Sequence, residues 1–147
     1  NPPLRSEADM QALRQGLRDG AIDAVATDHA PHYPENKEVE FIYAAFGVTG
    51  LETAVAVVDR ELVRTGALSW NDAVRVFSQA PARILGITGG TLAPGSPADI
   101  TIYNPDSPWT VDPEKMRSKS MNTPYFGWEM PGRAAAIVVG GLLRPIG

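Results

Sequence analysis

A short apolar segment that ends in a polar cluster is the feature that most constrains the fold of this chain. Residues 22–27 (Ile-Asp-Ala-Val-Ala-Thr) are mostly apolar and have the length of a strand, a pattern typical of strands buried on both faces of a parallel sheet. Asp28, His29 and His32 follow directly, and Pro31 disfavours a helical face shared by the two histidines. Because α/β barrels form their active sites at the carboxyl ends of the strands, the pattern predicts an α/β fold with a functional site after this strand.

The same cluster also has a purely structural interpretation. Asp28 could cap a helix and the two histidines could bond to backbone groups, because an Asp-His-x-x-His sequence is not specific by itself. Spacing alone leaves these two interpretations open.

Helical patterns flank the predicted strand on both sides. Ser6 with Asp9, and Ser69 with Asp72, have the spacing of a capping box, which predicts that a helix begins after each serine. Gly20 is a typical helix end. The predicted helices span residues 6–19, 51–65, 69–77 and 81–86, and a polar loop without periodicity is expected over 33–40.

The character of the sequence changes near residues 88–92, where Gly and Pro become frequent. Alternating or apolar segments at 100–103 and 134–139 then predict strands. Residues 1–90 hold 8 Lys and Arg against 12 Asp and Glu, whereas residues 91–147 hold 5 of each. We therefore expect two units, an α/β unit over 1–90 and a small all-β unit over 91–147.

The residue counts exclude several kinds of site and partner. The 147 residues contain no Cys and two His, so disulfides and a complete zinc site of three or four His and Cys ligands are excluded. Any metal must rest on carboxylates or on ligands from outside the chain. The net charge of −4 disfavours nucleic acid as a partner, and no apolar run approaches the roughly 18 residues of a membrane span. The absence of Cys favours a cytoplasmic location.

Several motifs together resemble one family along all 147 residues. They are Asn1-Pro2-Pro3-Leu4-Arg5, Thr27-Asp28-His29-Ala30-Pro31-His32, Phe46-Gly47-Val48-Thr49-Gly50-Leu51-Glu52-Thr53, Pro81-Ala82-Arg83-Ile84-Leu85-Gly86, Gly95-Ser96-Pro97-Ala98-Asp99 and Asn122-Thr123-Pro124-Tyr125-Phe126-Gly127. In these the sequence resembles the long bacterial-type dihydroorotases of the amidohydrolase superfamily. The resemblance implies that residues 1–90 are the C-terminal part of a metal-dependent (β/α)8 hydrolase barrel and that residues 91–147 belong to a small β-sandwich.

The resemblance also implies an enzyme that interconverts N-carbamoyl-L-aspartate and dihydroorotate in pyrimidine biosynthesis, with one or two zinc ions that activate a water. Asp28 matches the residue that binds zinc and carries the proton from that water to the leaving ring nitrogen. His32 matches a residue that contacts the substrate carboxylate, and Asn1 one that hydrogen-bonds to the pyrimidine ring. Phe46 and Gly47 match a loop whose backbone groups meet the ring amide.

The other zinc ligands of that family have no counterpart in this chain. They are a His-x-His pair, two later histidines and a bridging acid or modified lysine, whereas both histidines here fall in the 28–32 cluster. A whole barrel also needs about 250 residues, so the chain resembles the C-terminal third of a dihydroorotase and is expected to be inactive alone. The chain begins at Asn1, without an initiator Met or a signal-peptide pattern. We therefore expect the sequence to start partway through a longer protein. By resemblance, the partners are a small-molecule substrate, further copies of the chain and, as a further candidate, aspartate transcarbamoylase.

Three alternatives remain open at this stage. A hydantoinase or allantoinase is one, although Ala30-Pro31-His32 favours a dihydroorotase. An inactive homologue that serves aspartate transcarbamoylase as a structural partner is the second, and the intact Asp28 argues against it. A stand-alone binding module is the third, and only the short length supports it.

The remaining polar and aromatic residues have structural interpretations. His29 is expected to support the site rather than to touch the substrate. We interpret Arg5 as part of a surface ion pair and Lys37 as a solvated loop residue. Glu52 is interpreted as a negative charge at a helix start, where the helix dipole favours it. Asp99 is assigned to a turn, and Trp109, Phe126 and Trp128 are expected in the core of the β unit.

Overall fold

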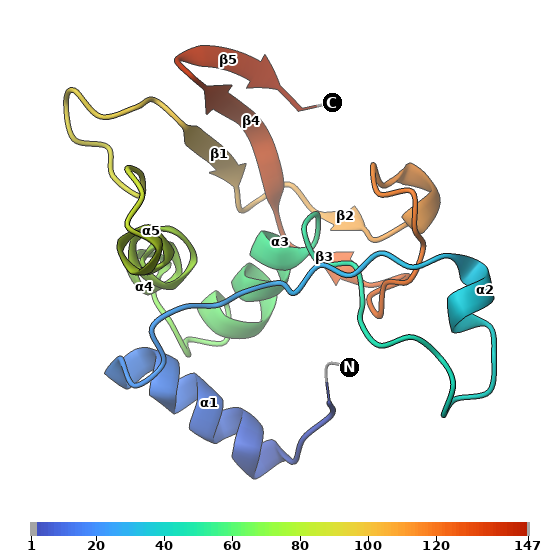
Figure 1. Cartoon of the computed structure of the whole chain (residues 1–147). Coiled ribbons are helices and arrows are strands. Elements are labelled where there is room, and N and C mark those ends of the chain that lie inside the picture. Colours follow the sequence, from blue (N-terminus) through green and yellow to red (C-terminus); the bar gives the residue numbers. More distant parts are fainter. Residues whose placement is uncertain (1–2, 147) are drawn as a thin grey trace.

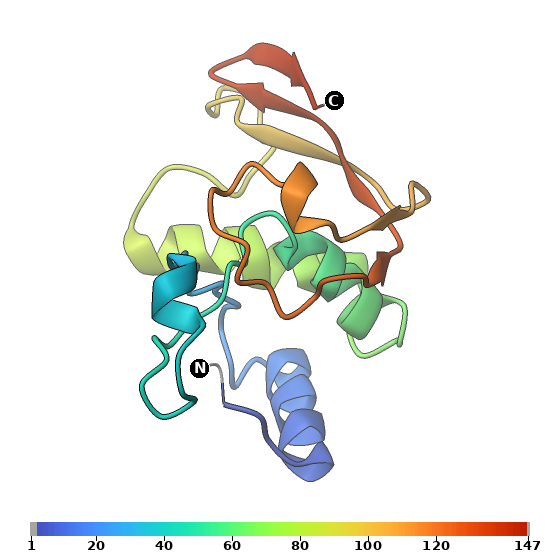
Figure 2. The same cartoon turned by 90° about the vertical axis from the view of Figure 1, so that its right-hand side faces the viewer.

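The computed structural model describes residues 3–146, and both views show three layers along its length (Figures 1 and 2). An amino-terminal helix lies at one end, further helices lie in the middle and two small sheets lie at the other end. The helical elements are α1 (Glu7–Asp19), α2 (Pro34–Lys37), α3 (Ala54–Val58), η1 (Asp59–Val63), α4 (Trp70–Val74), η2 (Arg75–Gln79), α5 (Ala80–Leu85) and η3 (Pro113–Lys115). Within residues 3–146, no helix has both the length and the hydropathy needed to cross a membrane.

Both predicted capping boxes are confirmed. The Ser6 hydroxyl accepts the backbone N–H of Asp9, and the Asp9 carboxylate accepts the N–H of Ser6, at the start of α1. Ser69 and Asp72 make the same pair of bonds at the start of α4. These reciprocal bonds satisfy backbone donors that the first turn of a helix leaves free. The end predicted at Gly20 is also confirmed, with φ 76° in the left-handed region.

After residue 50, α3 and η1 together span 54–63, within the predicted 51–65, whereas the helix that begins after Ser69 is longer than its separate signals suggested. α3 passes directly into η1, a π-helical run, and α4 passes through the π-helical run η2 into α5. The helix predicted from Ser69 and the turn predicted at 81–86 are therefore one continuous helical rod, which Figure 2 shows crossing the middle layer. Pro81 is tolerated inside this rod because it follows a π-helical run, where the α-helical bonding pattern is already interrupted.

The prediction of a strand over residues 22–27 is wrong within the part of the chain that the structure describes. The segment is extended but forms no strand, and its surroundings contain one isolated parallel bridge, between His29 and Val48. A parallel strand needs a ladder on a neighbouring strand, and residues 3–146 supply no such neighbour here. Instead, the Val25 N–H bonds to the carbonyl of Val76 at 3.0 Å. The loop expected over 33–40 is also corrected, because it contains the four-residue helix α2.

An apolar cluster joins the amino-terminal helix to the middle layer. Leu17 of α1 packs with Leu68 and with Val76 of η2, and all three are buried. Ile22 and Val25 of the extended segment pack against the same cluster. The segment that leads to Asp28 is thus held by side-chain burial where strand pairing is absent.

The carboxyl-terminal layer contains two antiparallel sheets. The strands are β1 (Ile100–Asn104), β2 (Trp109–Thr110), β3 (Glu129–Met130), β4 (Arg133–Val139) and β5 (Leu142–Pro145). β4 lies between β1 and β5 in the larger sheet, and β2 pairs with β3 in the smaller one. The strands predicted at 100–103 and 134–139 are therefore confirmed.

The second apolar cluster joins the smaller sheet to α3. It consists of Ala56, Val111 and Met130, with Trp109 packed against it. The expected core position of Trp109 is confirmed, but that of Phe126 is wrong because 70% of Phe126 is exposed. Trp128 is also exposed rather than buried. Its ring lies against Tyr125 and under the Arg60 guanidinium, 4.3 Å from the ring centroid.

A buried carboxylate connects the larger sheet to the helices. Asp59 in η1 is 1% exposed and accepts a hydrogen bond of 2.9 Å from the Tyr103 hydroxyl of β1. The Arg64 guanidinium lies 3.4 Å from the other Asp59 oxygen. Burial and the Asp59 carboxylate raise the pKa of Tyr103 above its usual value of 10.0, so the phenol stays neutral and donates. The Asp59 charge is thus compensated from both sides, as a buried charge requires.

Candidate active site

Asp28 stands at the end of the extended segment in an unusual backbone conformation. Its φ is 45°, and it is the one non-glycine residue with a positive φ among the described residues. Left-handed φ values are rare outside glycine, and Asp and Asn adopt them more readily than most residues. Such conformations cluster at functional sites, and the Asp28 side chain is exposed rather than engaged as a helix cap. The structural interpretation of Asp28 as a cap is therefore wrong.

His32 lies against the Phe46–Gly47 loop. Its Nε2 is 2.6 Å from the carbonyl oxygen of Phe46. Gly47 is buried with φ 111°, and a Cβ at this position would clash with the Cβ of Ala30. The two loops that carry the predicted substrate-binding residues thus meet at close range. Their roles toward a substrate stay predictions, and Asn1, the fourth of these residues, lies outside the described residues.

His29 fastens the start of the next loop. Its Nδ1 accepts the backbone N–H groups of Gly50 at 3.1 Å and Leu51 at 3.3 Å. An accepting Nδ1 carries no proton, so the neutral ring is protonated on Nε2. The His29 ring therefore bonds to the backbone, as the structural interpretation of the cluster expects, and its support of a substrate site stays a prediction.

Sequence reasoning missed two polar residues that hold the same loops. The Lys37 ammonium donates to the carbonyls of Ala45 at 2.8 Å and Gly47 at 3.1 Å. The interpretation of Lys37 as a solvated loop residue is therefore wrong. Asn122, which lies between η3 and β3, bonds through its side-chain amide to both loops. The Asn-Thr-Pro signal around Asn122 was visible in the sequence, but nothing in it named the loops as partners.

Glu52 also has a longer reach than expected. Its carboxylate accepts the backbone N–H groups of Arg117 at 2.8 Å and Ser118 at 2.9 Å. Glu52 lies just before α3 (Ala54–Val58), as a charge at a helix start would. Its two bonds to a distant segment show that it does more than interact with the helix dipole. Glu52 instead ties the segment before Asn122 to the middle layer.

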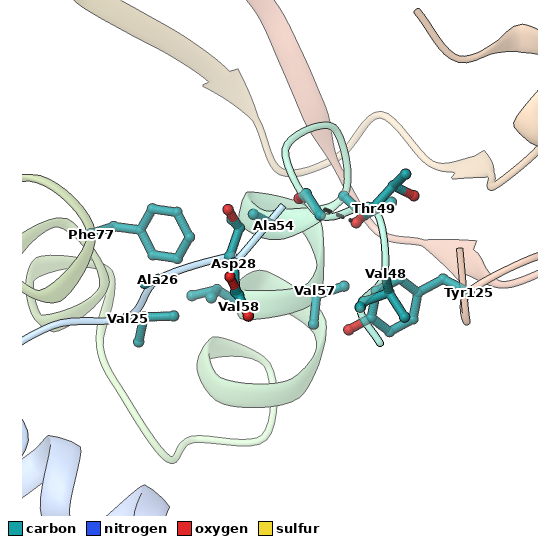
Figure 3. A pocket seen from close by; sticks show the side chains of 14 residues that line it. Val25, Ala26, Asp28, Val48, Thr49, Ala54, Val57, Val58, Phe77 and Tyr125 are labelled. Carbon is teal, nitrogen blue, oxygen red and sulfur yellow. Dashed lines mark hydrogen bonds between the residues drawn. The ribbon is translucent and has the colours of Figure 1, made fainter. Parts of the chain in front are cut away.

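A cavity of about 260 Å³ lies between the extended segment and α3 (Figure 3). Its labelled walls are mostly apolar, and Asp28 supplies the one carboxylate among the described residues that line it. The Thr49 hydroxyl is buried and has no hydrogen-bond partner among residues 3–146. Burial raises the pKa of Tyr125 at the other end of the cavity, which keeps that phenol neutral. The cavity therefore offers one charged group on otherwise mostly apolar walls, and Asp28 is exposed whereas His32 is half-buried.

Within residues 3–146, no group of three or more His, Asp or Glu side chains is arranged to hold a metal ion. Asp28 is an exposed carboxylate at the end of the segment, and carboxylate oxygens are suitable zinc ligands. It therefore fits the part of a single ligand in a site that other ligands complete.

The model of the amidohydrolase family matches residues 2–143, which is nearly the whole chain. The chain therefore belongs to the amidohydrolase family.

Two curated relatives of the chain are named dihydroorotase. The chain is 53% identical over 141 residues to the dihydroorotase of Syntrophus aciditrophicus (strain SB), which covers 96% of this chain and 33% of that protein. Identity to the dihydroorotase of Pelotomaculum thermopropionicum is also 53%, with the same coverage. The chain thus spans about a third of the length of the curated relatives that it matches, and the resemblance to dihydroorotases is confirmed.

Solved structures of related enzymes have the same fold over this region. The L-hydantoinase (dihydropyrimidinase) of Arthrobacter aurescens matches with a TM-score of 0.90 and 33% identity, covering 97% of this chain and 33% of that one. A D-hydantoinase (dihydropyrimidinase) from Thermus sp. matches with a TM-score of 0.88 and 28% identity, covering 100% and 34%. The α/β amidohydrolase fold is confirmed by these similarities.

Proposed function

We propose that this chain is the C-terminal part of a zinc-dependent dihydroorotase, which interconverts N-carbamoyl-L-aspartate and dihydroorotate in pyrimidine biosynthesis. The observation that carries the proposal is the contact of His32 with the Phe46–Gly47 loop, next to the strained backbone of Asp28. A proton carrier thus adjoins polar groups suited to a small anionic ring. Identity of 53% to a protein named dihydroorotase supports the same reaction.

Asp28 is the residue of this chain that would bind zinc and move the proton. When bound, zinc lowers the pKa of a water and polarises the ring carbonyl. Asp28 would accept a proton from the attacking water and would return it to the ring nitrogen that leaves. A carboxylate can do both because its ionised form accepts a proton through either oxygen and its protonated form donates it. The remaining zinc ligands would come from outside residues 3–146.

His32 and the adjoining loop would hold the substrate. With Nε2 bonded to the Phe46 carbonyl, the other ring nitrogen of His32 is available to a substrate carboxylate. That nitrogen donates to a carboxylate when the ring is the imidazolium. Backbone groups of Phe46 and Gly47 would meet the ring amide, and Asn1 would bond to the pyrimidine ring.

The remaining parts of the proposal concern the whole protein. Residues 1–90 would complete a (β/α)8 barrel, and residues 91–147 would form part of a β-sandwich that other segments complete. The chain alone would be inactive and would bind zinc poorly, because it offers one ligand. The complete protein would be a cytoplasmic homo-oligomer, and an association with aspartate transcarbamoylase stays a prediction.

A hydantoinase or allantoinase activity is the second candidate. Solved structures named hydantoinase match nearly the whole chain, but a shared fold does not by itself set the substrate. Their identity of at most 33% is also lower than the 53% to a dihydroorotase, so we place it second.

The test is an assay of the complete protein, with the residues that precede this chain present and zinc supplied. Dihydroorotate, hydantoin and allantoin are compared by kcat/KM. We expect dihydroorotate to be preferred by at least about a hundredfold, because a site built for a ring carboxylate loses that contact with the other two substrates. A preference for hydantoin or allantoin would establish the second candidate, and turnover of none of the three would favour an inactive homologue.

A further inference from the structure

Asn122 is the point at which the carboxyl-terminal part of the chain reaches the candidate site. Its side-chain Oδ1 accepts the backbone N–H of His32 at 3.3 Å. Its Nδ2 donates to the carbonyls of Ala30 at 2.9 Å and Gly47 at 3.2 Å. One half-buried side chain thus bonds to both loops that carry the proposed substrate-binding groups.

The backbone of Asn122 adds a fourth bond. Its carbonyl accepts the N–H of Thr49 at 3.1 Å. The loop after the extended segment and the loop around Gly47 are therefore fastened to the same residue, over sequence separations of 75 to 92 residues for the side-chain bonds. Each bond is modest on its own, at about 0.5–1.5 kcal/mol, but together they fix the position of one loop relative to the other.

Gly47 is where this fastening matters most. Its φ of 111° lies in a region that glycine adopts readily, so the residue has more freedom to leave its position than any other type. Its carbonyl receives two donors, Lys37 Nζ at 3.1 Å and Asn122 Nδ2 at 3.2 Å. Two donors converging on one carbonyl oppose rotation of the peptide that follows Gly47. The adjoining Phe46 carbonyl is thereby kept in reach of His32.

Asn122 itself is held by a separate contact. Glu52 accepts the N–H groups of Arg117 and Ser118 in the same segment. The segment before β3 is therefore joined to the middle layer at two places, through Glu52 and through Asn122. This second attachment makes Asn122 a fixed point from which the loops can be held.

We infer that Asn122 is a positioning residue, which sets the geometry of His32 and of the Phe46–Gly47 loop for substrate binding. The inference rests on the proposed function for its kinetic part only. The side-chain amide is engaged by backbone groups through its oxygen and both donor positions, so it acts through the loops rather than on the substrate. Among its contacts, none is to Asp28, so its loss should weaken binding more than proton transfer.

The kinetic test compares Asn122→Asp and Asn122→Ala in the complete protein. The Asp variant keeps the shape but turns an oxygen toward the carbonyls of Ala30 and Gly47, so it removes both donors. The control is Asn71→Asp, at an exposed position in the first turn of α4. We expect KM for dihydroorotate to rise about tenfold or more in both Asn122 variants, as the loss of one to two net hydrogen bonds would give, with kcat within about threefold and unchanged zinc content.

A double variant separates positioning from general destabilisation. Because Asn122 acts partly through His32 and partly through the Phe46–Gly47 loop, His32→Ala combined with Asn122→Asp should raise KM by less than the product of the two single effects. Additive effects of the two changes, an unchanged KM, or equal losses in kcat and zinc content would each overturn the inference.

A second measurement does not depend on the reaction at all. Amide hydrogen exchange is followed in segments 29–33 and 46–50 of the complete protein, for wild type and the same variants. We expect faster exchange in both segments in the Asn122 variants, with no change in Asn71→Asp and an unfolding midpoint close to wild type. Unaltered exchange would overturn the inference even if dihydroorotate is turned over, and faster exchange without turnover would refute only the proposed function.

Discussion

The close approach of the two site loops can be tested by adding one methyl group. A Cβ at Gly47 would clash with the Cβ of Ala30 and lie 3.4 Å from His32 Nε2, at a φ of 111°. Backbone strain at such a φ costs about 1–3 kcal/mol for a residue with a side chain, and forced overpacking costs about 1–3 kcal/mol more. We therefore expect Gly47→Ala to destabilise the protein by about 2–6 kcal/mol if the loops stay in contact. The alternative response is that the clash pushes the two loops apart.

Two matched variants divide this effect into its parts. Gly66 has φ 75°, and a Cβ added to it would meet nothing within 4 Å, so Gly66→Ala carries backbone strain alone, about 1–2 kcal/mol. Ala30→Gly removes the atom that the new methyl meets. The double variant Ala30→Gly with Gly47→Ala should therefore regain the overpacking part and keep the strain.

The assay is urea unfolding of the complete protein, with KM for dihydroorotate measured in parallel. We expect the loss of stability to follow the order Gly47→Ala, the double variant and then Gly66→Ala. If Gly47→Ala proves no more harmful than Gly66→Ala, or if Ala30→Gly restores nothing, the loops do not meet as described.

Three further predictions concern the proton carrier, the metal and the interface between sheet and helices. Asp28→Ala in the complete enzyme should reduce turnover of dihydroorotate at least about a hundredfold, as loss of a general base does, and a variant that keeps a tenth of the wild-type rate would contradict the assigned role. The purified chain of residues 1–147 should bind zinc substoichiometrically and leave dihydroorotate intact, which metal analysis and the assay would check; chelator-sensitive hydrolysis would refute it. Tyr103→Phe should cost about 1–3 kcal/mol in unfolding free energy, because it removes a donor from buried Asp59. Since the folded pKa of Tyr103 is raised above 10.0, the stability it contributes is present below about pH 10 and is lost as the pH rises further, a loss that the Phe variant should not show.

The parts of the fold that could be predicted are those that depend on neighbours in sequence. The Ser6 and Ser69 capping boxes each close over three residues, and Gly20 ends α1 through its own backbone freedom. The strand at 22–27 could not be assigned correctly on these grounds. The apolar pattern of this segment predicts burial, and Val25 does pack against an apolar cluster. Strand pairing, however, depends on a neighbouring strand, about which the pattern of one segment says nothing.

The candidate site also contains residues that the sequence could name and residues that it could not. Asp28 and His32 lie in one short motif, and Phe46 and Gly47 in another, so both could be named from the sequence. Lys37 could not, because a lysine among polar residues has no signal for the carbonyls of Ala45 and Gly47 that it meets. Charged and amide side chains in loops are usually solvated, and only the folded chain distinguishes those that bond to backbone.

The distance along the chain between Asn122 and the loops that it holds has a consequence for synthesis. Asn122 follows Ala30 by 92 residues, so at a translation rate of about 5–20 residues per second it is made roughly 5 to 18 s later. During that interval the growing chain carries Asp28, His32 and then the Gly47 loop without the bonds that Asn122 makes to these loops. The candidate site can therefore take its final form only after Asn122 has been synthesised, because until then its loops lack the four bonds that Asn122 makes.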